Sequence, residues 1–512
     1  MAKKTHTWLY LVLGGSLGLL LATIWSFHYL PLTDLPEHVL ASKVLVDYED
    51  PGTCYSSFYT VETPWKPYSA TFFWSARLLA PVATPLHAAK LYLSLSLVLT
   101  IAGIGFWLKA VAPGQMVQLI PATMLLYSSF FFVGMLNTLF AVPFFFFALW
   151  SCHEILKKGR TSPFYDVGLA VCLLLIYFSH ITVFGAAILV LGTLWLFSPN
   201  RRRGWRLALA AAPSVGLTLA YFLLTTSKGV HTLLNISYDP ILLRASSLLV
   251  PFNAVFDRVN HVWVYEPDQL VIDILLGILI VLGTVVGSRR SAFRSEGVVS
   301  KRHVVVVALS LLGSTLLLPS LVGGALSIGI RLGYFATLVL LMLAPTGWSR
   351  SPALRAGVVI LALAMPLLFA YHCYLFQGEM GDFERIVDRM PSCQVVLPIV
   401  TELNGAGLHN YPHLHDADWY CYLKGGINPY TITRFPYFPV QARCKFFPAA
   451  PGEFSMASFK YARNEKGVQY FLARTRETGI IDDLKAHVPL LARGGLWWVF
   501  GPNRGTRVNC GE

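Results

Sequence analysis

Repeated apolar runs of about twenty residues restrict the fold of this chain more than any other feature of its sequence. A helix of about 20 residues is 30 Å long, the thickness of a bilayer's hydrocarbon core. The first run, from Trp8 to Phe27, follows Lys3 and Lys4, as a secretory signal would. It is longer than the usual apolar region of a signal, about 7–15 residues, and no small-x-small cleavage site follows it. We therefore expect a retained first membrane helix.

The remaining runs predict a polytopic α-helical membrane protein. Only 13% of the residues are charged, whereas soluble domains carry about 25%. We expect eleven transmembrane helices, at residues 8–28, 88–108, 115–134, 136–155, 164–180, 181–198, 205–226, 269–288, 304–323, 332–348 and 354–375.

The positions of lysine and arginine predict the orientation. With the N-terminus in the cytoplasm, every short inner loop carries positive charge, and the outer connections after spans three and five carry none. The inner residues are Lys3, Lys4, Lys109, Lys157, Lys158, Arg160, Arg201, Arg202, Arg203, Arg206, Arg289, Arg290, Arg294, Lys301, Arg302, Arg350 and Arg355. This bias accounts for the net charge of +13 without a nucleic-acid partner.

The same orientation places three long segments outside: 29–87, 227–268 and the tail. We divide the chain into a transmembrane module, 1–376, whose first outer loop is 29–87, and an extracytoplasmic C-terminal α/β domain, 377–512. In the tail, GDFERIVDRM predicts an amphipathic helix, and CQVVLPIV, VQYFLA and LWWVFG predict strands. TGIIDDLKAHVPLLARGG predicts a further helix that ends at Gly494 and Gly495.

Cysteine usage is consistent with this orientation. Five cysteines would face the oxidising exterior: Cys54, Cys393, Cys421, Cys444 and Cys510. Because five is odd, at least one cannot pair within this set. We take Cys421–Cys444 as a provisional pairing.

The stretch PLTDLPEHVL, residues 31–40, brings three ionisable residues together just after the first span. In one interpretation Asp34 caps a helix that has Pro36 in its first turn, and His38 is a polar neighbour on the same face. In the other, Asp34 acts as a general base toward an acceptor hydroxyl or holds a divalent cation against a phosphate leaving group. Aromatic residues follow, and residues 66–87 predict a short amphipathic helix at the membrane surface.

This arrangement resembles the GT-C superfamily of membrane glycosyltransferases, which use polyprenyl-phosphate-linked sugars. The motif Asp34-Leu35-Pro36-Glu37-His38 is similar to the acidic openings of first outer loops in that superfamily, especially the D-x-P-x-H form of bacterial members. The resemblance implies that Asp34 is a catalytic or metal-associated carboxylate, with Glu37 and His38 beside it.

One departure from the superfamily pattern concerns the second acid. Many members supply one from the second outer loop, but here GMLNTLF offers only Asn137. The other candidates in outer loops are Glu37, Asp47, Glu49, Asp50, Asp239 and Asp257. Two alternatives therefore stay open: a divalent cation, Mg²⁺ or Mn²⁺, or a mechanism without metal.

Cationic groups near the outer leaflet are candidates for binding the donor phosphate. Arg331 is expected at the outer end of span ten, where the positive-inside rule does not explain it, and His180 at the turn between spans five and six. In the tail, HNYPHLHDADWYCYLKGG is rich in His and Asp but matches no zinc spacing, so we interpret it as a polar loop. Its Trp419 and Tyr420 could stack on an acceptor sugar.

We therefore expect an integral membrane glycosyltransferase, in a bacterial inner membrane, that moves a sugar from a polyprenyl-phosphate-linked donor to an extracytoplasmic glycan, lipid or protein acceptor. One alternative is a transporter or flippase. Ion-coupled transporters place ionisable residues near the membrane midplane, whereas Glu154 and Asp273 lie near span ends here. Another alternative is a non-catalytic scaffold that presents the tail.

Overall fold

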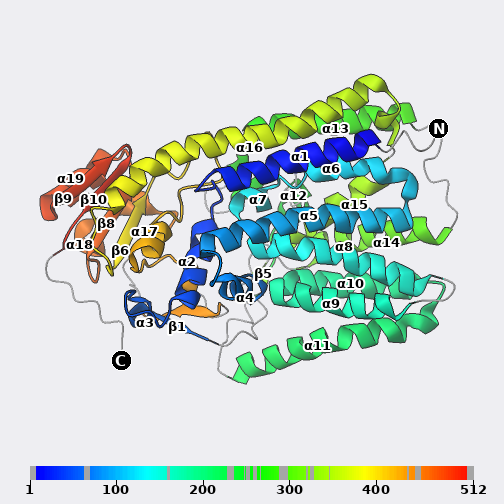
Figure 1. Ribbon diagram of the computed structural model, residues 1–512, viewed down its shortest axis with the longest axis horizontal. Coiled ribbons are helices and arrows are strands. Elements are labelled where there is room, and N and C mark those ends of the chain that lie inside the picture. Colours follow the sequence, from blue (N-terminus) through cyan, green and yellow to red (C-terminus); the bar gives the residue numbers. More distant parts are fainter. Residues whose placement is uncertain are drawn as a thin grey trace.

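The computed structural model describes residues 7–62, 70–157, 162–227, 236–246, 248–249, 254–257, 262–265, 267–287, 298–318, 321–322, 328–344, 346–434, 438–443 and 451–503. Long helices lie side by side at one end of the molecule, and a small sheet with short helices lies at the other (Figure 1). The described long helices are α1 (Thr7–Ser26), α5 (Pro85–Val111), α8 (Leu136–Leu156), α9 (Pro163–Ser179), α10 (Ile181–Phe197), α11 (Gly204–Ser227), α13 (Pro267–Gly287), α14 (Val298–Leu317), α15 (Ile328–Leu343) and α16 (Pro352–Val387).

These helices coincide with ten of the eleven expected spans, because long apolar runs satisfy their backbone hydrogen bonds internally as helices. Among the described residues, α1, α5, α8, α11 and α16 are long and apolar enough to cross a membrane. Four further apolar helical stretches are only 10–17 residues long: 163–179, 181–197, 303–317 and 331–342. The protein is an integral membrane protein with several apolar helices.

The expected third span, 115–134, is not one helix. It consists of a 3₁₀ turn, η2 (Pro113–Gln118), and two short helices, α6 (Leu119–Met124) and α7 (Ser129–Val133). A turn at 125–128 separates the two helices, and Gly134, with φ +80°, ends α7 in the left-handed conformation. A side chain rarely adopts this conformation, and a Cβ at position 134 would also lie 3.2 Å from the backbone nitrogen of Leu35. The broken segment thus packs against the acidic motif.

Helix α16 is longer than the expected last span and connects the two ends of the molecule (Figure 1). Its final turns include the amphipathic helix expected in the tail. After it comes a sheet of order β6-β8-β10-β9, built from β6 (Val396–Val400), β8 (Tyr470–Arg474), β9 (Leu490–Gly494) and β10 (Trp497–Phe500). Strand β6 is parallel to β8, and β10 is antiparallel to both β8 and β9.

Three of the strands, β6, β8 and β10, lie where the sequence predicts them. The predicted helix that follows β8 is shorter than expected: α19 spans Thr478–His487, and residues 490–494 form β9 instead. Pro489 explains the difference, because a proline disfavours the α conformation of the residue before it. Val488 is extended, with φ −136° and ψ 135°.

The first outer loop packs against the tail and pairs with it in a small sheet. It contains α2 (Leu35–Val46), α3 (Tyr55–Phe58), β1 (Tyr59–Val61) and α4 (Ala70–Leu79). Strand β1 pairs antiparallel with β7 (Val440–Ala442), and α2 packs against α17 (Ala417–Lys424). The disulfide joins Cys54 to Cys393, and Cys421 is a free, buried thiol, so the Cys421–Cys444 pairing is wrong. Cys444 and Cys510 lie outside the described residues.

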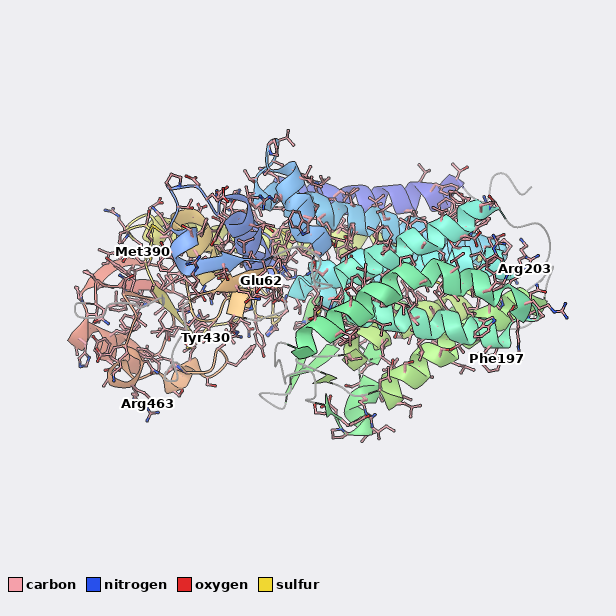
Figure 2. All side chains as sticks on the ribbon, turned by 90° about the horizontal axis from the view of Figure 1, so that it is seen from below. Glu62, Phe197, Arg203, Met390, Tyr430 and Arg463 are labelled. Carbon is pink, nitrogen blue, oxygen red and sulfur yellow. A yellow bond between two sulfur atoms is a disulfide. The ribbon has the colours of Figure 1, made fainter. Side chains whose placement is uncertain are left out.

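Basic connections and the tail lie at opposite ends of the molecule. Phe197 and Arg203 lie at the free end of the helices, whereas Met390, Tyr430 and Arg463 lie at the other end (Figure 2). The basic connection and the tail are thus separated along the length of the helices.

Candidate active site

The acidic motif lies at the start of α2, where the backbone of the broken segment holds it. The Thr33 amide donates to the Phe132 carbonyl over 3.1 Å, and the Asp34 amide donates to the Val133 carbonyl over 2.7 Å. Asp34 occupies the N-cap position of α2, but its side chain makes no capping hydrogen bond. The carboxylate of Asp34 therefore does not serve the helix as a cap.

His415, from the tail, lies between the acids of this motif. Its Nε2 is 3.5 Å from Oδ1 of Asp34, and its Nδ1 is 3.5 Å from Oε1 of Glu37. One candidate ligand atom from each of the three residues lies within 4.8 Å of the others. The side chains of Glu37 and His415 are 7% and 9% exposed, whereas that of Asp34 is 26% exposed. Asp34 is thus the member of this group that a substrate can approach.

Two further tail residues extend the cluster. Oε1 of Glu453 lies 3.2 Å from Nδ1 of His415, and the other oxygen of Glu453 lies 3.2 Å from a terminal nitrogen of Arg434. Asp418 is buried nearby, and its Oδ1 accepts a hydrogen bond from Asn428 Nδ2 over 2.5 Å.

The cluster contains more carboxylates than cationic side chains, and its electrostatics follow from this excess. Burial raises the pKa of Glu37 well above its usual value, and the charges of Asp34, Asp418 and Glu453 add to the effect while His415 opposes it. Burial by itself lowers the pKa of His415, but the charges of Glu37 and Glu453 outweigh burial and raise this pKa well above its usual value. Burial also raises the pKa of Asp418, to about 7. The site therefore favours a bound positive charge.

His38 does not join this cluster. Its side chain is buried, and its ring packs edge-on against Phe72 at 5.8 Å between centroids and lies 6.3 Å from Phe73. Burial lowers the pKa of His38 to about 4. Because the ring is buried against these aromatic side chains and is not open to a substrate, we withdraw the catalytic role expected for His38.

The two expected phosphate-binding residues lie close to each other. Arg331, on α15, is buried, and its Nε donates to Thr138 Oγ1 on α8 over 3.4 Å. His180 lies between α9 and α10, where its Nδ1 accepts a hydrogen bond from the Thr182 amide over 3.3 Å. Helix α10, which begins directly after His180, packs against α15, which carries Arg331. Thr138 lies five residues after Val133, which accepts the hydrogen bond from Asp34.

Trp419 and Tyr420 are in the core and present no ring face to an acceptor. They are 1% and 0% exposed. Trp419 packs edge-on against Tyr29 with 5.0 Å between centroids, and the Tyr420 hydroxyl donates to the Pro391 carbonyl over 2.8 Å. We therefore withdraw both as acceptor-binding residues.

Sequence reasoning missed three residues of the cluster: His415, Glu453 and Arg434. The signal for His415 was the density of His and Asp in residues 409–418, which we had interpreted as a polar loop. Glu453 and Arg434 lie in stretches with no distinguishing pattern, so only the docking of the tail reveals them.

The helical bundle with its appended sheet is a fold that this chain shares with solved structures of low sequence identity. The chain is similar to ArnT from Cupriavidus metallidurans bound to undecaprenyl phosphate, with a TM-score of 0.52 and 12% identity, over 97% of this chain and 98% of that one. It is similar to the apo state of the same protein over the same shares, with a TM-score of 0.52 and 10% identity.

A third solved structure is the archaeal oligosaccharyltransferase AglB from Archaeoglobus fulgidus, in complex with an inhibitory peptide and a dolichol-phosphate. It has 11% identity and a TM-score of 0.49, over 91% of this chain and 69% of that one. No protein-family model matches this chain, and no curated protein matches it in sequence.

Proposed function

We propose that this protein is an integral membrane glycosyltransferase that moves a sugar from a polyprenyl-phosphate-linked donor to an acceptor outside the membrane. The observation that carries the proposal is the cluster of Asp34, Glu37 and His415 at the point where the chain leaves the first span. The fold adds support, because a solved structure that shares it, ArnT, holds undecaprenyl phosphate.

In this reaction Asp34 is the base. The acceptor hydroxyl oxygen attacks the anomeric carbon while the bond from that carbon to the phosphate oxygen breaks, with inversion. The hydroxyl proton moves to Asp34, and the electron pair of the broken bond leaves with the lipid phosphate. Asp34 suits this role because its carboxylate is the most exposed of the cluster and is not used as a helix cap.

The donor set of the cluster also fits a divalent cation such as Mg²⁺ or Mn²⁺. In octahedral coordination, adjacent ligands that each lie about 2.1 Å from the ion are about 3.0 Å apart, and opposite ligands are about 4.2 Å apart. The candidate atoms of Asp34, Glu37 and His415, within 4.8 Å of one another, need only small movements to match these spacings. When bound, the cation would neutralise charge on the leaving phosphate.

Arg331 and His180 are the proposed binding groups for the donor phosphate. A guanidinium can hold two phosphate oxygens in parallel, and the imidazole adds a third donor. Both residues come from helix ends rather than from the tail, so they would hold the part of the donor that stays with the lipid.

We also propose the orientation that this reaction needs. The N-terminus and the basic loops face the cytoplasm of a bacterial inner membrane, and residues 377–512 form the extracytoplasmic domain that helps to bind the glycan, lipid or protein acceptor. The placement of Phe197 and Arg203 far from the sheet supports this orientation (Figure 2).

The test is transfer by purified protein from a panel of polyprenyl-phosphate sugars, with and without EDTA. We expect Asp34→Asn to lower the rate by about 10²–10⁴-fold, the usual contribution of a general base. Asp47→Asn is the matched control, because Asp47 lies at the other end of α2 in a surface ion pair with Lys43. Full activity of Asp34→Asn would refute the proposal, and uptake into sealed vesicles without a new glycosidic bond would favour a transporter.

A further inference from the structure

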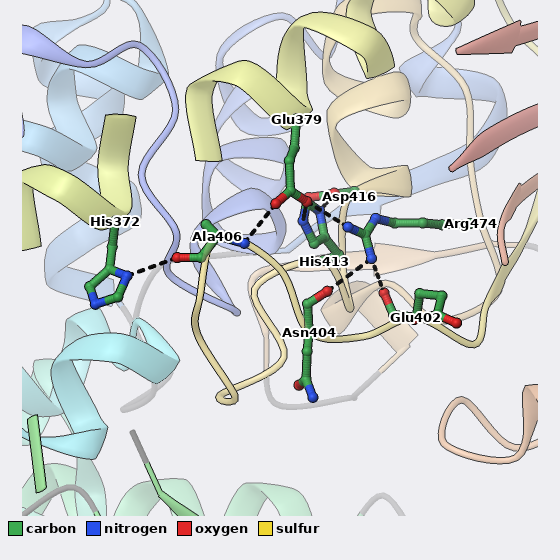
Figure 3. Close-up of polar contacts among 8 residues, drawn as sticks. All are labelled: His372, Glu379, Glu402, Asn404, Ala406, His413, Asp416 and Arg474. Atoms are coloured by element: carbon green, nitrogen blue, oxygen red, sulfur yellow. Dashed lines mark hydrogen bonds and ion pairs between the residues drawn. The ribbon is translucent and has the colours of Figure 1, made fainter. Parts of the chain in front are cut away.

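A second polar cluster, outside the candidate active site, fixes the tail segment 404–416 to helix α16 (Figure 3). His372 and Glu379 are seven residues apart on α16, so they lie on the same face, two turns apart. Both bind Ala406. The Ala406 amide donates to Glu379 Oε1 over 2.7 Å, and His372 Nδ1 donates to the Ala406 carbonyl over 2.8 Å.

The backbone that these residues hold is strained. Ala406 has φ +54° and Tyr411 has φ +60°, values in the left-handed region that residues with a side chain rarely adopt. Such conformations persist only where the surroundings enforce them, and they are concentrated at functional sites. Here the bonds from His372 and Glu379 hold both polar groups of Ala406.

The cluster continues from Glu379 to the residues that flank His415. Oε2 of Glu379 lies 2.7 Å from His413 Nε2, and the Arg474 guanidinium donates to the same oxygen over 2.5 Å. On its other side, His413 Nδ1 lies 2.6 Å from Asp416 Oδ2. The side chains of His413 and Asp416 are both 0% exposed.

The contact between His413 and Asp416 closes a turn that contains only Leu414 and His415. It therefore restricts the backbone of His415 directly. The middle of the segment has a separate attachment, where Thr33 Oγ1 donates to the Asn410 carbonyl over 2.5 Å and Asn410 Nδ2 donates to the Phe132 carbonyl over 2.7 Å.

We propose that the chain His372–Glu379–His413–Asp416, which we name the α16 clamp, positions His415 against Asp34 and Glu37. The clamp residues touch no substrate, so they are positioning residues and not catalytic ones. The inference rests on the proposed function only in taking His415 as part of the active site. It adds that a membrane helix, α16, and not the first outer loop alone, sets the geometry of that site.

Two substitutions at His413 separate the two contacts of its ring. An asparagine amide nitrogen can take the place of Nδ1, so His413→Asn keeps the contact with Asp416. A glutamine amide nitrogen can take the place of Nε2, so His413→Gln keeps the contact with Glu379 and loses the one that closes the turn. His409→Asn is the control, because His409 is an exposed residue of the same segment.

We expect His413→Gln to lower kcat by about 10–100-fold, with KM for the lipid donor unchanged. If transfer depends on Mn²⁺, the apparent affinity for Mn²⁺ as activator should fall by the same factor. His413→Asn should recover most of this loss, and His409→Asn should match the wild type. A purely structural role would instead lower the melting temperature of both His413 variants without this order.

Hydrogen–deuterium exchange of residues 404–418, measured without substrate, tests the clamp independently of sugar transfer. Exchange should rise in His413→Gln and stay low in His413→Asn. If His413→Gln matches the wild type in both exchange and kcat, the clamp is refuted. If exchange rises but no donor in the panel supports transfer by the wild type, the proposed function fails while the clamp stands. Should His413→Gln not fold, Asp416→Ala, which removes the same turn-closing contact from its other side, replaces it with the same expectations.

Discussion

The disulfide between Cys54 and Cys393 ties together the two parts of the chain that form the candidate active site. Cys54 belongs to the same outer loop as Asp34 and Glu37, and Cys393 immediately precedes the sheet of the tail that carries His415. We predict that the double substitution Cys54→Ser, Cys393→Ser weakens the docking of the tail on the first outer loop. It should lower stability and sugar transfer together.

The size of the effect follows from the length of chain that the bond closes. For a sequence separation of 339 residues, the chain-entropy relation gives about 5.8 kcal/mol at 25 °C. This value is an upper limit, because membrane helices that remain inserted already restrict both ends of the loop. Other contacts also survive, among them the hydrogen bond from the Tyr59 hydroxyl to the Gly426 carbonyl, 3.2 Å long. We therefore expect a loss of about 2–5 kcal/mol, the usual range for a native disulfide.

Thermal unfolding in detergent, followed by circular dichroism and tryptophan fluorescence, measures this loss. The wild type should melt at a lower temperature under reducing conditions, and the double variant should melt at that lower temperature with or without reductant. Equal melting temperatures for the oxidised wild type and the double variant would refute the reasoning. They would mean that packing between α2 and α17 alone fixes the tail.

Two further predictions concern single residues. Arg331→Gln should raise KM for the lipid-linked donor by about 10-fold, the value of one lost charge-assisted hydrogen bond. The control Arg350→Gln, at an exposed position of a basic loop, should leave KM unchanged. Equal KM values for the two variants would contradict a phosphate-binding role for Arg331. For Glu379, burial alone raises the pKa, but hydrogen bonds from His413 and Ala406 and the charges of His413 and Arg474 lower it to about 2, below the unfolded value of about 4.3. The ionised Glu379 carboxylate therefore stabilises the fold above pH 4.3, and this stabilisation is lost as the pH falls toward 2. Glu379→Gln should flatten the pH dependence of the unfolding free energy between these values. An unchanged slope would refute this role of the Glu379 carboxylate.

Most of the helical spans could be predicted because length and apolar character are local properties of the sequence. The break at residues 125–128 could not be predicted from the sequence. The stretch is as apolar as a membrane span, because its residues, including Tyr127 and Ser128, are buried in the folded protein. For strand β9, Pro489 marks the end of the preceding helix in the sequence, but Leu490, Leu491 and Ala492 suit a helix or a strand equally well, and pairing with β10 decides between them.

The first-loop half of the candidate site was also visible in the sequence, because Asp34 and Glu37 lie close together just after a span. Their partner His415 was not, since it is 381 residues away from Asp34 in the sequence and meets it only after the tail docks. Sequence spacing predicts neighbours on one helix, but it carries no information on contacts between elements that the chain brings together by folding.

The structure shows what the segment GMLNTLF and the residues before it contribute to the site in place of an acid. That loop region contributes backbone to the site, through the carbonyls of Phe132 and Val133. At position 134 itself there is little room for a side chain, because a Cβ would lie 3.2 Å from the Leu35 nitrogen and 3.3 Å from the Asp34 nitrogen. The tail supplies the missing groups instead: His415 lies against both acids, and Glu453 lies at the same ring nitrogen, Nδ1, as Glu37. The first loop alone would leave Asp34 and Glu37 beside each other with no positive charge between them. We therefore expect the tail to be an integral part of the proposed catalytic site, and its attachment to α16 to be required for activity.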